Sequence, residues 1–178
     1  DLEMSFVDVE DILEMTEGYI KRLFSEVLDV DIALPIPRMT YKDAMERYGS
    51  DKPDTRFGME IVDCSELVKD CGFGVFSGAV AAGGSVRATV AKDGAKVLTR
   101  KEIDKLTEQA RGIGAKGLAF VRWVDDAPSC SFSKFMSEEE LSALLAHIGC
   151  EKGDVALFCA DRDRVTLPTL GQIRLTVA

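Results

Sequence analysis

The sequence contains few of the residues that build metal or redox sites. Its 178 residues include one histidine, His147, and five cysteines with no C-x-x-C pair among them. A structural zinc site needs closely spaced Cys and His ligands, so this pattern argues against one. We expect no metal site, and free thiols in a reducing compartment, with a Cys64–Cys71 disulfide as the remaining alternative.

Long apolar runs and an excess of basic residues are also absent. No apolar run approaches the roughly 20 residues that span a bilayer, and the first residues have neither the basic start nor the apolar core of a signal peptide. The net charge of −9 argues against a protein that holds nucleic acid through broad phosphate contact. The composition, 46% apolar and 30% charged, predicts a soluble globular protein. Together with the expected free thiols and the lack of a membrane-spanning run, it leads us to expect a cytoplasmic protein without membrane contact.

The first third of the chain predicts two helices separated by a connection. Residues 1–7 alternate in polarity as a strand does. Asp8 caps a long helix, and the wide apolar stripe of that helix is expected to pack on parts of the protein outside this sequence. A connection over residues 29–39 follows. Thr40 then caps a short helix that ends at Gly49.

The remaining residues predict a compact unit of helices and strands. Thr99 followed three residues later by Glu102 is the sequence pattern of a capping box, which predicts the start of a helix. Gly83-Gly84 is typical of a hairpin turn and lacks the spacing of a phosphate-binding loop. The expected elements are a short helix over 62–70, strands over 74–81 and 86–92, a helix from Thr99 to Gly114, a strand over 116–124, a helix from Ser137 to Gly149, a strand over 154–160 and a helix over 166–177.

Residues 47–57 form the most informative string in the chain. The run Arg47-Tyr48-Gly49-Ser50-Asp51-Lys52-Pro53-Asp54-Thr55-Arg56-Phe57 places basic residues, carboxylates, a glycine and a proline at the end of a helix. It resembles the RYGSDKPD-type segment of bacterial aspartyl-tRNA synthetases, where the catalytic domain meets an inserted domain. The first residues, Asp1-Leu2-Glu3-Met4-Ser5-Phe6, resemble the end of the second signature motif of class II synthetases.

Several short strings extend this resemblance over the rest of the chain. Leu98-Thr99-Arg100-Lys101, Gly114-Ala115-Lys116-Gly117-Leu118-Ala119, Ser133-Lys134-Phe135 and Gly153-Asp154 resemble, in order, the inserted GAD domain of these synthetases. The resemblance implies an α+β fold, a two-layer GAD-type domain with helices on one face of a mostly antiparallel sheet. It also implies a partial class II catalytic core over residues 1–56 and the inserted domain over residues 57–178.

The resemblance assigns a substrate-binding role to the first residues. It implies that Asp1 closes the second motif and holds the arginine that grips the side-chain carboxylate of aspartate. A bidentate guanidinium needs such acceptors to keep its donors aligned. Glu3 lies two residues further along the same strand face, so it either lines that pocket or faces solvent.

The loop that contains Asp51, Lys52, Asp54 and Arg56 has two possible roles. It either borders the active site or stabilises the junction between the two domains. We favour the structural role, through internal ion pairs and Asx turns. The acidic run Glu138–Glu140 and the single histidine His147 need no functional explanation, because they suit the first and last turns of one predicted helix.

The implied parent enzyme uses ATP and Mg²⁺ to activate L-aspartate, transfers it to tRNA, and is a homodimer. The arginines that the resemblance places on the α-phosphate lie outside this sequence. The segment by itself is therefore expected to have no catalytic residue and no cofactor. Its acidic net charge predicts weak or no tRNA binding by the segment alone. The alternative is a non-catalytic module that docks on tRNA or on a partner subunit, as in the B subunit of the tRNA-dependent amidotransferase, which shares the inserted domain.

Overall fold

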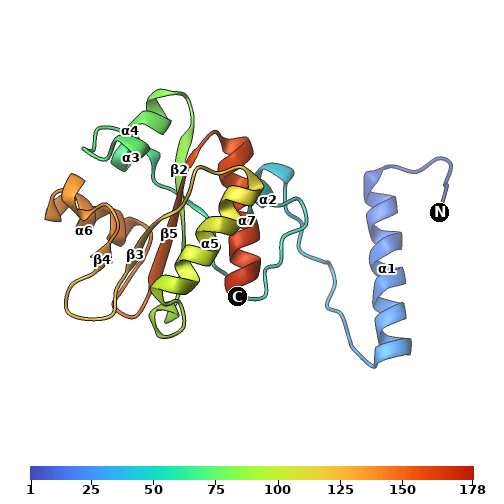
Figure 1. Cartoon of the computed structure of the whole chain (residues 1–178). Coiled ribbons are helices and arrows are strands. Elements are labelled where there is room, and N and C mark those ends of the chain that lie inside the picture. The colour runs from blue at the N-terminus through green and yellow to red at the C-terminus, as the bar shows by residue number, and fades with distance from the viewer. The chain divides into compact units, whose positions relative to one another are not determined.

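The N-terminal residues fold into one long helix. The computed structural model describes residues 1–178 as two compact units, Asp1–Met39 and Thr40–Ala178 (Figure 1). In the first unit, helix α1 spans Val9–Leu28, and Asp8 caps it in a reciprocal capping box with Asp11, as predicted. The strand predicted over residues 1–7 is wrong. No second strand pairs with this segment, and a lone strand has no partner for its main-chain groups.

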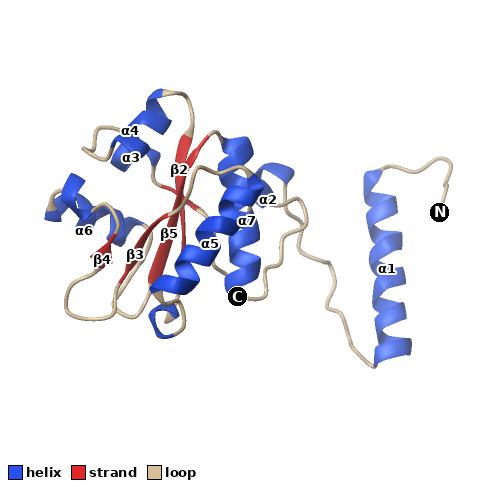
Figure 2. Ribbon diagram, viewed as in Figure 1, coloured by secondary structure: helices blue, strands red, loops and turns tan.

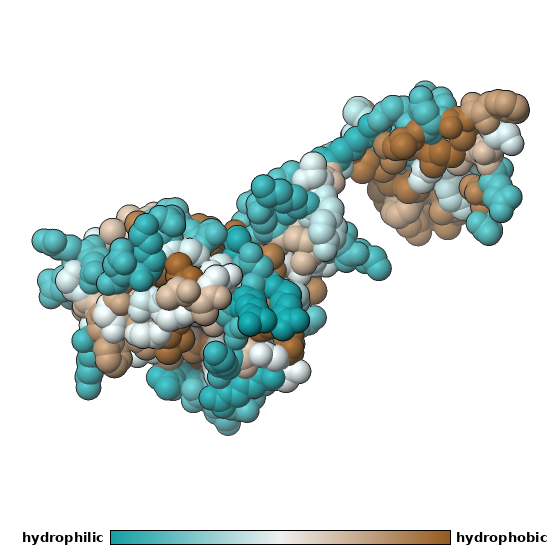
Figure 3. Space-filling model, turned by 90° about the horizontal axis from the view of Figure 1, so that it is seen from above, coloured by the Kyte–Doolittle hydropathy of each residue, from teal (hydrophilic) through white to brown (hydrophobic).

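The connection after α1 is tied to that helix by long side chains. The Glu17 carboxylate accepts a hydrogen bond from the main-chain N–H of Ile36 at 3.1 Å, and Arg38 pairs with Glu10 at 2.6 Å. No residue of α1 is buried within the unit, and Figure 3 shows apolar surface exposed on it. The exposed apolar side chains of the helix are Val9, Ile12, Tyr19, Leu23, Phe24, Val27 and Leu28.

A five-stranded sheet forms the centre of the second unit (Figure 2). Every neighbouring pair of strands is antiparallel, and the order is β1-β2-β5-β3-β4. The longest ladder joins β2 to β5, from Ser85 opposite Asp161 to Ala91 opposite Val155. The α+β class with an antiparallel sheet is thereby confirmed. The strands are β1 (Val62–Asp63), β2 (Ser85–Ala91), β3 (Ala119–Arg122), β4 (Ser129–Cys130) and β5 (Val155–Asp161).

Helices cover both faces of this sheet, not one face as the sequence suggested. Alternate residues of β5 show the arrangement, because Ala156 and Phe158 pack with α3, α4 and α6 whereas Val155 and Leu157 pack with α5 and α7. Figure 1 shows the sheet between the two groups. The helices of this unit are α2 (Tyr41–Tyr48), α3 (Ser65–Val68), α4 (Gly74–Ala81), α5 (Arg100–Ile113), α6 (Glu138–His147) and α7 (Asp163–Val177), with short 3₁₀ turns η1 (Gly94–Lys96) and η2 (Ser133–Phe135).

The predicted strand over 74–81, and with it the hairpin at Gly83-Gly84, is wrong. This segment is helix α4, which places Phe76 in an aromatic cluster of the core. The Phe76 ring lies 4.8 Å from that of Phe73, 5.0 Å from that of Phe132 and 5.8 Å from that of Phe158. The aromatic contacts select the helix, since a run of small and apolar residues has no strong period of its own.

The remaining corrections are small. Residues 62–70 form a two-residue strand followed by a single helical turn, where one short helix was expected. Helix α7 begins at Asp163, three residues before the predicted start. The five cysteines are free thiols, so the alternative Cys64–Cys71 disulfide is not formed. A bilayer crossing would require a longer and more apolar helix than any found here.

Candidate functional site at the junction of α2 and α7

Two glycines allow the end of α2 to lie directly against α7. Helix α2 starts at the Thr40 cap and ends at Gly49, which has the left-handed φ of 68° that favours glycine. A Cβ atom on Gly171, in the middle of α7, would lie 2.7 Å from the carbonyl oxygen of Gly49 and 2.8 Å from that of Tyr48. Only hydrogen atoms fit between the two backbones, so both positions require glycine.

One buried arginine holds the loop that follows α2. Arg174 of α7 is 1% exposed, and its guanidinium donates hydrogen bonds to three main-chain carbonyls. Nε reaches the oxygen of Met59 at 2.9 Å, and one terminal nitrogen reaches those of Asp54 at 3.0 Å and Gly58 at 2.5 Å. Positive φ values at Gly58 and Met59 turn the backbone so that its carbonyls face the guanidinium. The loop conformation is thus fixed by a side chain that lies more than 100 residues further along the chain.

Two aromatic rings enclose the same guanidinium. The centre of the Arg174 guanidinium lies 4.8 Å from the ring centroid of Tyr48 and 4.7 Å from that of Phe57, within the range of cation–π contacts. Burial lowers the pKa of Arg174 below its ordinary value. Planar, weakly hydrated arginine suits this enclosed position better than lysine would.

Ion pairs reinforce the loop on its solvent side. Arg47 binds Glu60 with two hydrogen bonds of 2.6 and 2.8 Å, and Arg56 binds Asp54 with contacts of 2.5 to 3.1 Å. The Arg56 side chain, followed by the Arg56 main-chain N–H, lowers the pKa of Asp54 to about 2. The hydrogen bonds from Arg47 likewise hold the pKa of Glu60 below its ordinary value.

The structure brings together some of the residues predicted for this site. Asp54 and Arg56 form the internal ion pair that the sequence suggested, whereas the side chains of Asp51 and Lys52 are exposed and make no hydrogen bond or ion pair. In the N-terminal unit, Asp1 and Glu3 are exposed. Sequence reasoning missed Arg174 and Gly171, because neither lies in a recognisable motif.

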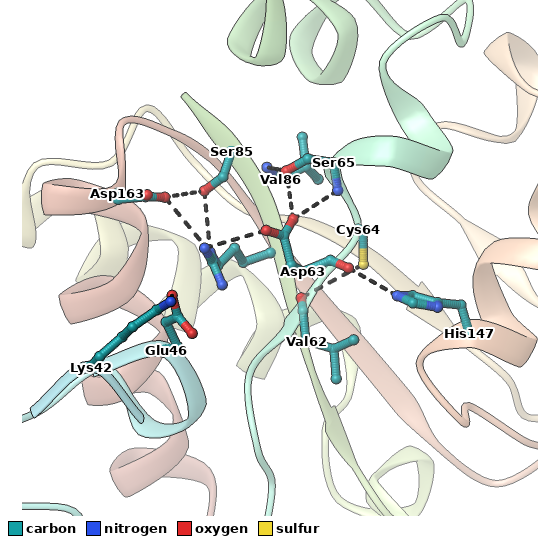
Figure 4. Close-up of polar contacts among 11 residues, drawn as sticks. Lys42, Glu46, Val62, Asp63, Cys64, Ser65, Ser85, Val86, His147 and Asp163 are labelled. Carbon is teal, nitrogen blue, oxygen red and sulfur yellow. Dashed lines mark hydrogen bonds and ion pairs between the residues drawn. The ribbon is translucent and has the colours of Figure 1, made fainter. Parts of the chain in front are cut away.

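A second polar cluster joins β1, β2 and the start of α7 (Figure 4). The Arg87 side chain is 10% exposed and lies 3.3 Å from an Asp63 oxygen and 3.7 Å from an Asp163 oxygen. Ser85 donates a 2.5 Å hydrogen bond to Asp163 and accepts one from Nε of Arg87 at 3.3 Å. Asp63 also accepts the main-chain N–H of Ser65 at 2.9 Å. Every charge in the cluster has a partner, which is typical of a structural network.

His147 does not serve the end of its own helix as predicted. Its Nε2 atom lies 2.9 Å from the main-chain oxygen of Asp63, so it connects α6 to the edge strand β1 (Figure 4). No group of three or more His, Cys, Asp or Glu side chains gathers in an arrangement that could hold a metal ion. The junction arginines Arg47, Arg56 and Arg174 are all engaged with protein oxygens. What the buried Arg174 contacts do is fix the backbone conformation of the loop.

Comparison with known proteins identifies the family to which this domain belongs. The family model described as the GAD domain matches residues 76–170, more than half of the chain. The chain belongs to the GAD domain family. The match runs from α4 into α7, so the loop-binding Arg174 follows the matched GAD residues and its carbonyl partners precede them.

Curated relatives match over nearly the whole chain. The chain is 53% identical to the aspartate–tRNA(Asp/Asn) ligase of Lachnoclostridium phytofermentans over 100% of its length, which is 30% of that protein. It is 52% identical to the aspartate–tRNA ligase of Agathobacter rectalis over 98% of the chain and 29% of the relative. The aspartate–tRNA ligase of Clostridium perfringens is 50% identical, with 100% and 30% covered. The chain therefore spans about 30% of the length of these relatives.

Proposed function

We propose that this chain is the GAD-bearing part of a bacterial aspartate–tRNA ligase. The observation that carries the proposal is identity of 50 to 53% along the whole chain to proteins of that name. The complete enzyme would activate L-aspartate with ATP and Mg²⁺ and transfer it to tRNA, as a homodimer in the cytoplasm. The alternative of an amidotransferase B subunit has less support, because the similarity to the ligases also includes residues 1–75, before the matched GAD residues.

Within that enzyme, residues 1–56 would belong to the catalytic core and residues 57–178 to the inserted domain. The chain divides into its two compact units between Met39 and Thr40. Helix α2 and the loop after it therefore pack with the GAD domain, although the proposed catalytic core includes them. Asp1, with Glu3 beside it, would hold the arginine that binds the aspartate carboxylate. Asp51, Lys52, Asp54 and Arg56 would form the junction between the two domains.

The test is aspartate-dependent exchange of pyrophosphate into ATP by the complete enzyme, with chain 1–178 measured in parallel. Exchange by the complete enzyme alone is expected, because nothing in this chain compensates the charge that develops on the phosphate. Exchange that depends on another amino acid, or none at all by an intact enzyme, would contradict the assignment. Turnover by chain 1–178 above a heat-inactivated sample would contradict the non-catalytic role of the segment.

A pair of variants of the complete enzyme tests the role of Asp1. Asp1→Asn is expected to raise the KM for aspartate about tenfold, because removal of an outer partner of a binding group typically weakens binding by 10- to 100-fold. Ser5→Ala, in the same exposed segment, is the matched control and should leave KM unchanged. Equal KM values in both variants would make Asp1 an ordinary surface residue.

A further inference from the structure

A pocket lies away from the junction of α2 and α7. It has a volume of about 580 Å³ and opens between α6 and residues 123–128, which follow β3. Its walls include Trp123, Met136, Leu141, Leu145 and Cys150. Pockets of about 300 to 1,000 Å³ with mostly apolar walls are where proteins bind ligands or side chains of a partner. This pocket shares no residue with the junction.

The buried residues of the pocket wall offer no charged or hydrogen-bonding group to a ligand. Leu145 and Cys150 belong to the buried core, and Trp123 packs on that core from the pocket side. Burial raises the pKa of the Cys150 thiol to about 11, so this sulfur is neutral at physiological pH. The indole nitrogen of Trp123 is buried without a hydrogen-bond partner, so it offers no polar contact at the surface.

Both charged residues that line this pocket are acidic. Asp126 and Glu138 are the only charged residues that line it, and no lysine or arginine does. Glu138 makes no ion pair. Asp126 pairs with Lys152 at 3.0 Å, but its side chain is 104% exposed, and an exposed pair contributes only about 0–1 kcal/mol. Glu138 is therefore available to an approaching cation, and Asp126 becomes available by exchange of its weak partner Lys152.

The carboxylates lie at the rim and the apolar residues lie inside. Asp126 and Glu138 are exposed, whereas Leu145 and Cys150 are buried. A buried apolar centre with a polar, charged rim is the usual anatomy of a protein–protein contact. A small molecule enclosed by the apolar walls would gain little from charges at the rim, whereas a peptide can place one side chain inside and others at the rim.

We propose that this pocket binds a basic peptide segment of a partner protein. One aromatic or aliphatic side chain of that segment enters between Trp123 and Leu141, and flanking Lys or Arg side chains pair with Asp126 and Glu138. The proposal does not depend on the activity of the complete enzyme, since it rests on the shape and charge of the GAD domain alone.

A random peptide library, displayed on phage and selected against chain 1–178, tests this inference. The expected result is enrichment of peptides that carry an apolar residue beside two or more basic residues. Trp123 is the only tryptophan of the chain, so its emission reports directly on the pocket. Enriched sequences without tryptophan are then synthesised, and each should change that emission in a saturable and salt-sensitive way.

Two matched pairs of variants locate the binding. Ala146 and Ala143 are both exposed on α6, but only Ala146 lines the pocket. Ala146→Phe should weaken binding by at least about tenfold because it fills the pocket, and Ala143→Phe should not. Glu138 and Glu139 share the first turn of α6, and only Glu138 lines the pocket, so Glu138→Gln should weaken binding more than Glu139→Gln.

Several results would overturn the inference. They are the absence of any enriched sequence, enrichment of acidic or uncharged apolar sequences, and equal binding to the Ala146→Phe and Ala143→Phe variants. The last result would place the captured peptides elsewhere, for example on the exposed apolar face of α1.

Discussion

Replacement of Arg174 is expected to destabilise the GAD unit more than any change on its surface. Arg174→Met removes three hydrogen bonds from a charged donor to the carbonyls of Met59, Asp54 and Gly58, and two cation–π contacts. Hydrogen bonds to charged groups contribute about 1.5–3 kcal/mol each, and their sum is offset in part by relief of burying a cation. The expected net loss is about 4 kcal/mol, a large share of the 5–15 kcal/mol typical of a folded domain.

The lysine variant separates charge from geometry. Arg174→Lys keeps the positive charge but cannot present planar donors to three carbonyls between two rings, so we expect a loss of about 2 kcal/mol. Arg56→Met serves as the control from the same junction, because the exposed pair of Arg56 with Asp54 should contribute no more than about 1 kcal/mol.

Urea unfolding followed by the emission of Trp123 measures these changes. The only tryptophan of the chain lies in the Thr40–Ala178 unit and packs on the face of the sheet opposite α7, so the signal reports global unfolding of that unit and not a local change at the junction. A shift of midpoint without a change of slope identifies a change in stability. A loss below about 1 kcal/mol for Arg174→Met would refute the reasoning, since buried carbonyls without donors could then not be costly.

Three further outcomes are expected from the same unfolding assay and from thiol chemistry. Gly171→Ala should destabilise the unit by about 2 kcal/mol, because the new Cβ atom would overlap the end of α2. Gly78→Ala, in a helix with free space at Cβ, should stabilise it by about 0.5 kcal/mol. Higher stability of both variants would contradict the close approach of α2 and α7. Burial favours a higher pKa for Asp154, but hydrogen bonds from Lys92 and two main-chain N–H groups outweigh burial and lower the pKa. The contribution of this carboxylate to the free energy of unfolding is therefore present above pH about 4 and is lost as the pH falls. Asp154→Asn should therefore lose about 2 kcal/mol at pH 7 and progressively less in acid, and a loss independent of pH would exclude the charge as the cause. Native protein should react with iodoacetamide first at Cys130, the one thiol that is only partly buried, and mass spectrometry showing equal labelling of all five would contradict the described core.

Local signals predicted the helix starts well. Helix α6 begins at its Ser137 cap, where the sequence indicated, because the hydrogen bonds of that cap with Glu140 join residues three apart and need no tertiary context. Helix α4 was missed for the opposite reason. Its run of small and apolar residues is compatible with a strand or a helix, and only the packing of Phe76 among distant aromatic rings decides between them.

The placement of helices on both faces of the sheet has a signal in the sequence of β5. Residues 155–159 of β5 form a continuous apolar run, as expected of a strand covered on both sides and not of one with a solvated face. The importance of residues 47–57 was recognisable from the string itself, but the residue that fixes it was not. Arg174 binds main-chain carbonyls, and carbonyls carry no sequence signature.

The central position of β5 constrains when the GAD unit can assemble during its synthesis. Strands β2 and β3 do not pair with each other, and each forms its main ladder with β5, whose first residue is Val155. The emerging chain must therefore carry β2 without its principal partner for more than 60 residues. Pairing across so long a separation is slow because loop closure precedes the gain from contacts. The sheet therefore cannot be completed until residues 155–161 have been synthesised, and mutations in β5 should reduce the yield of folded protein.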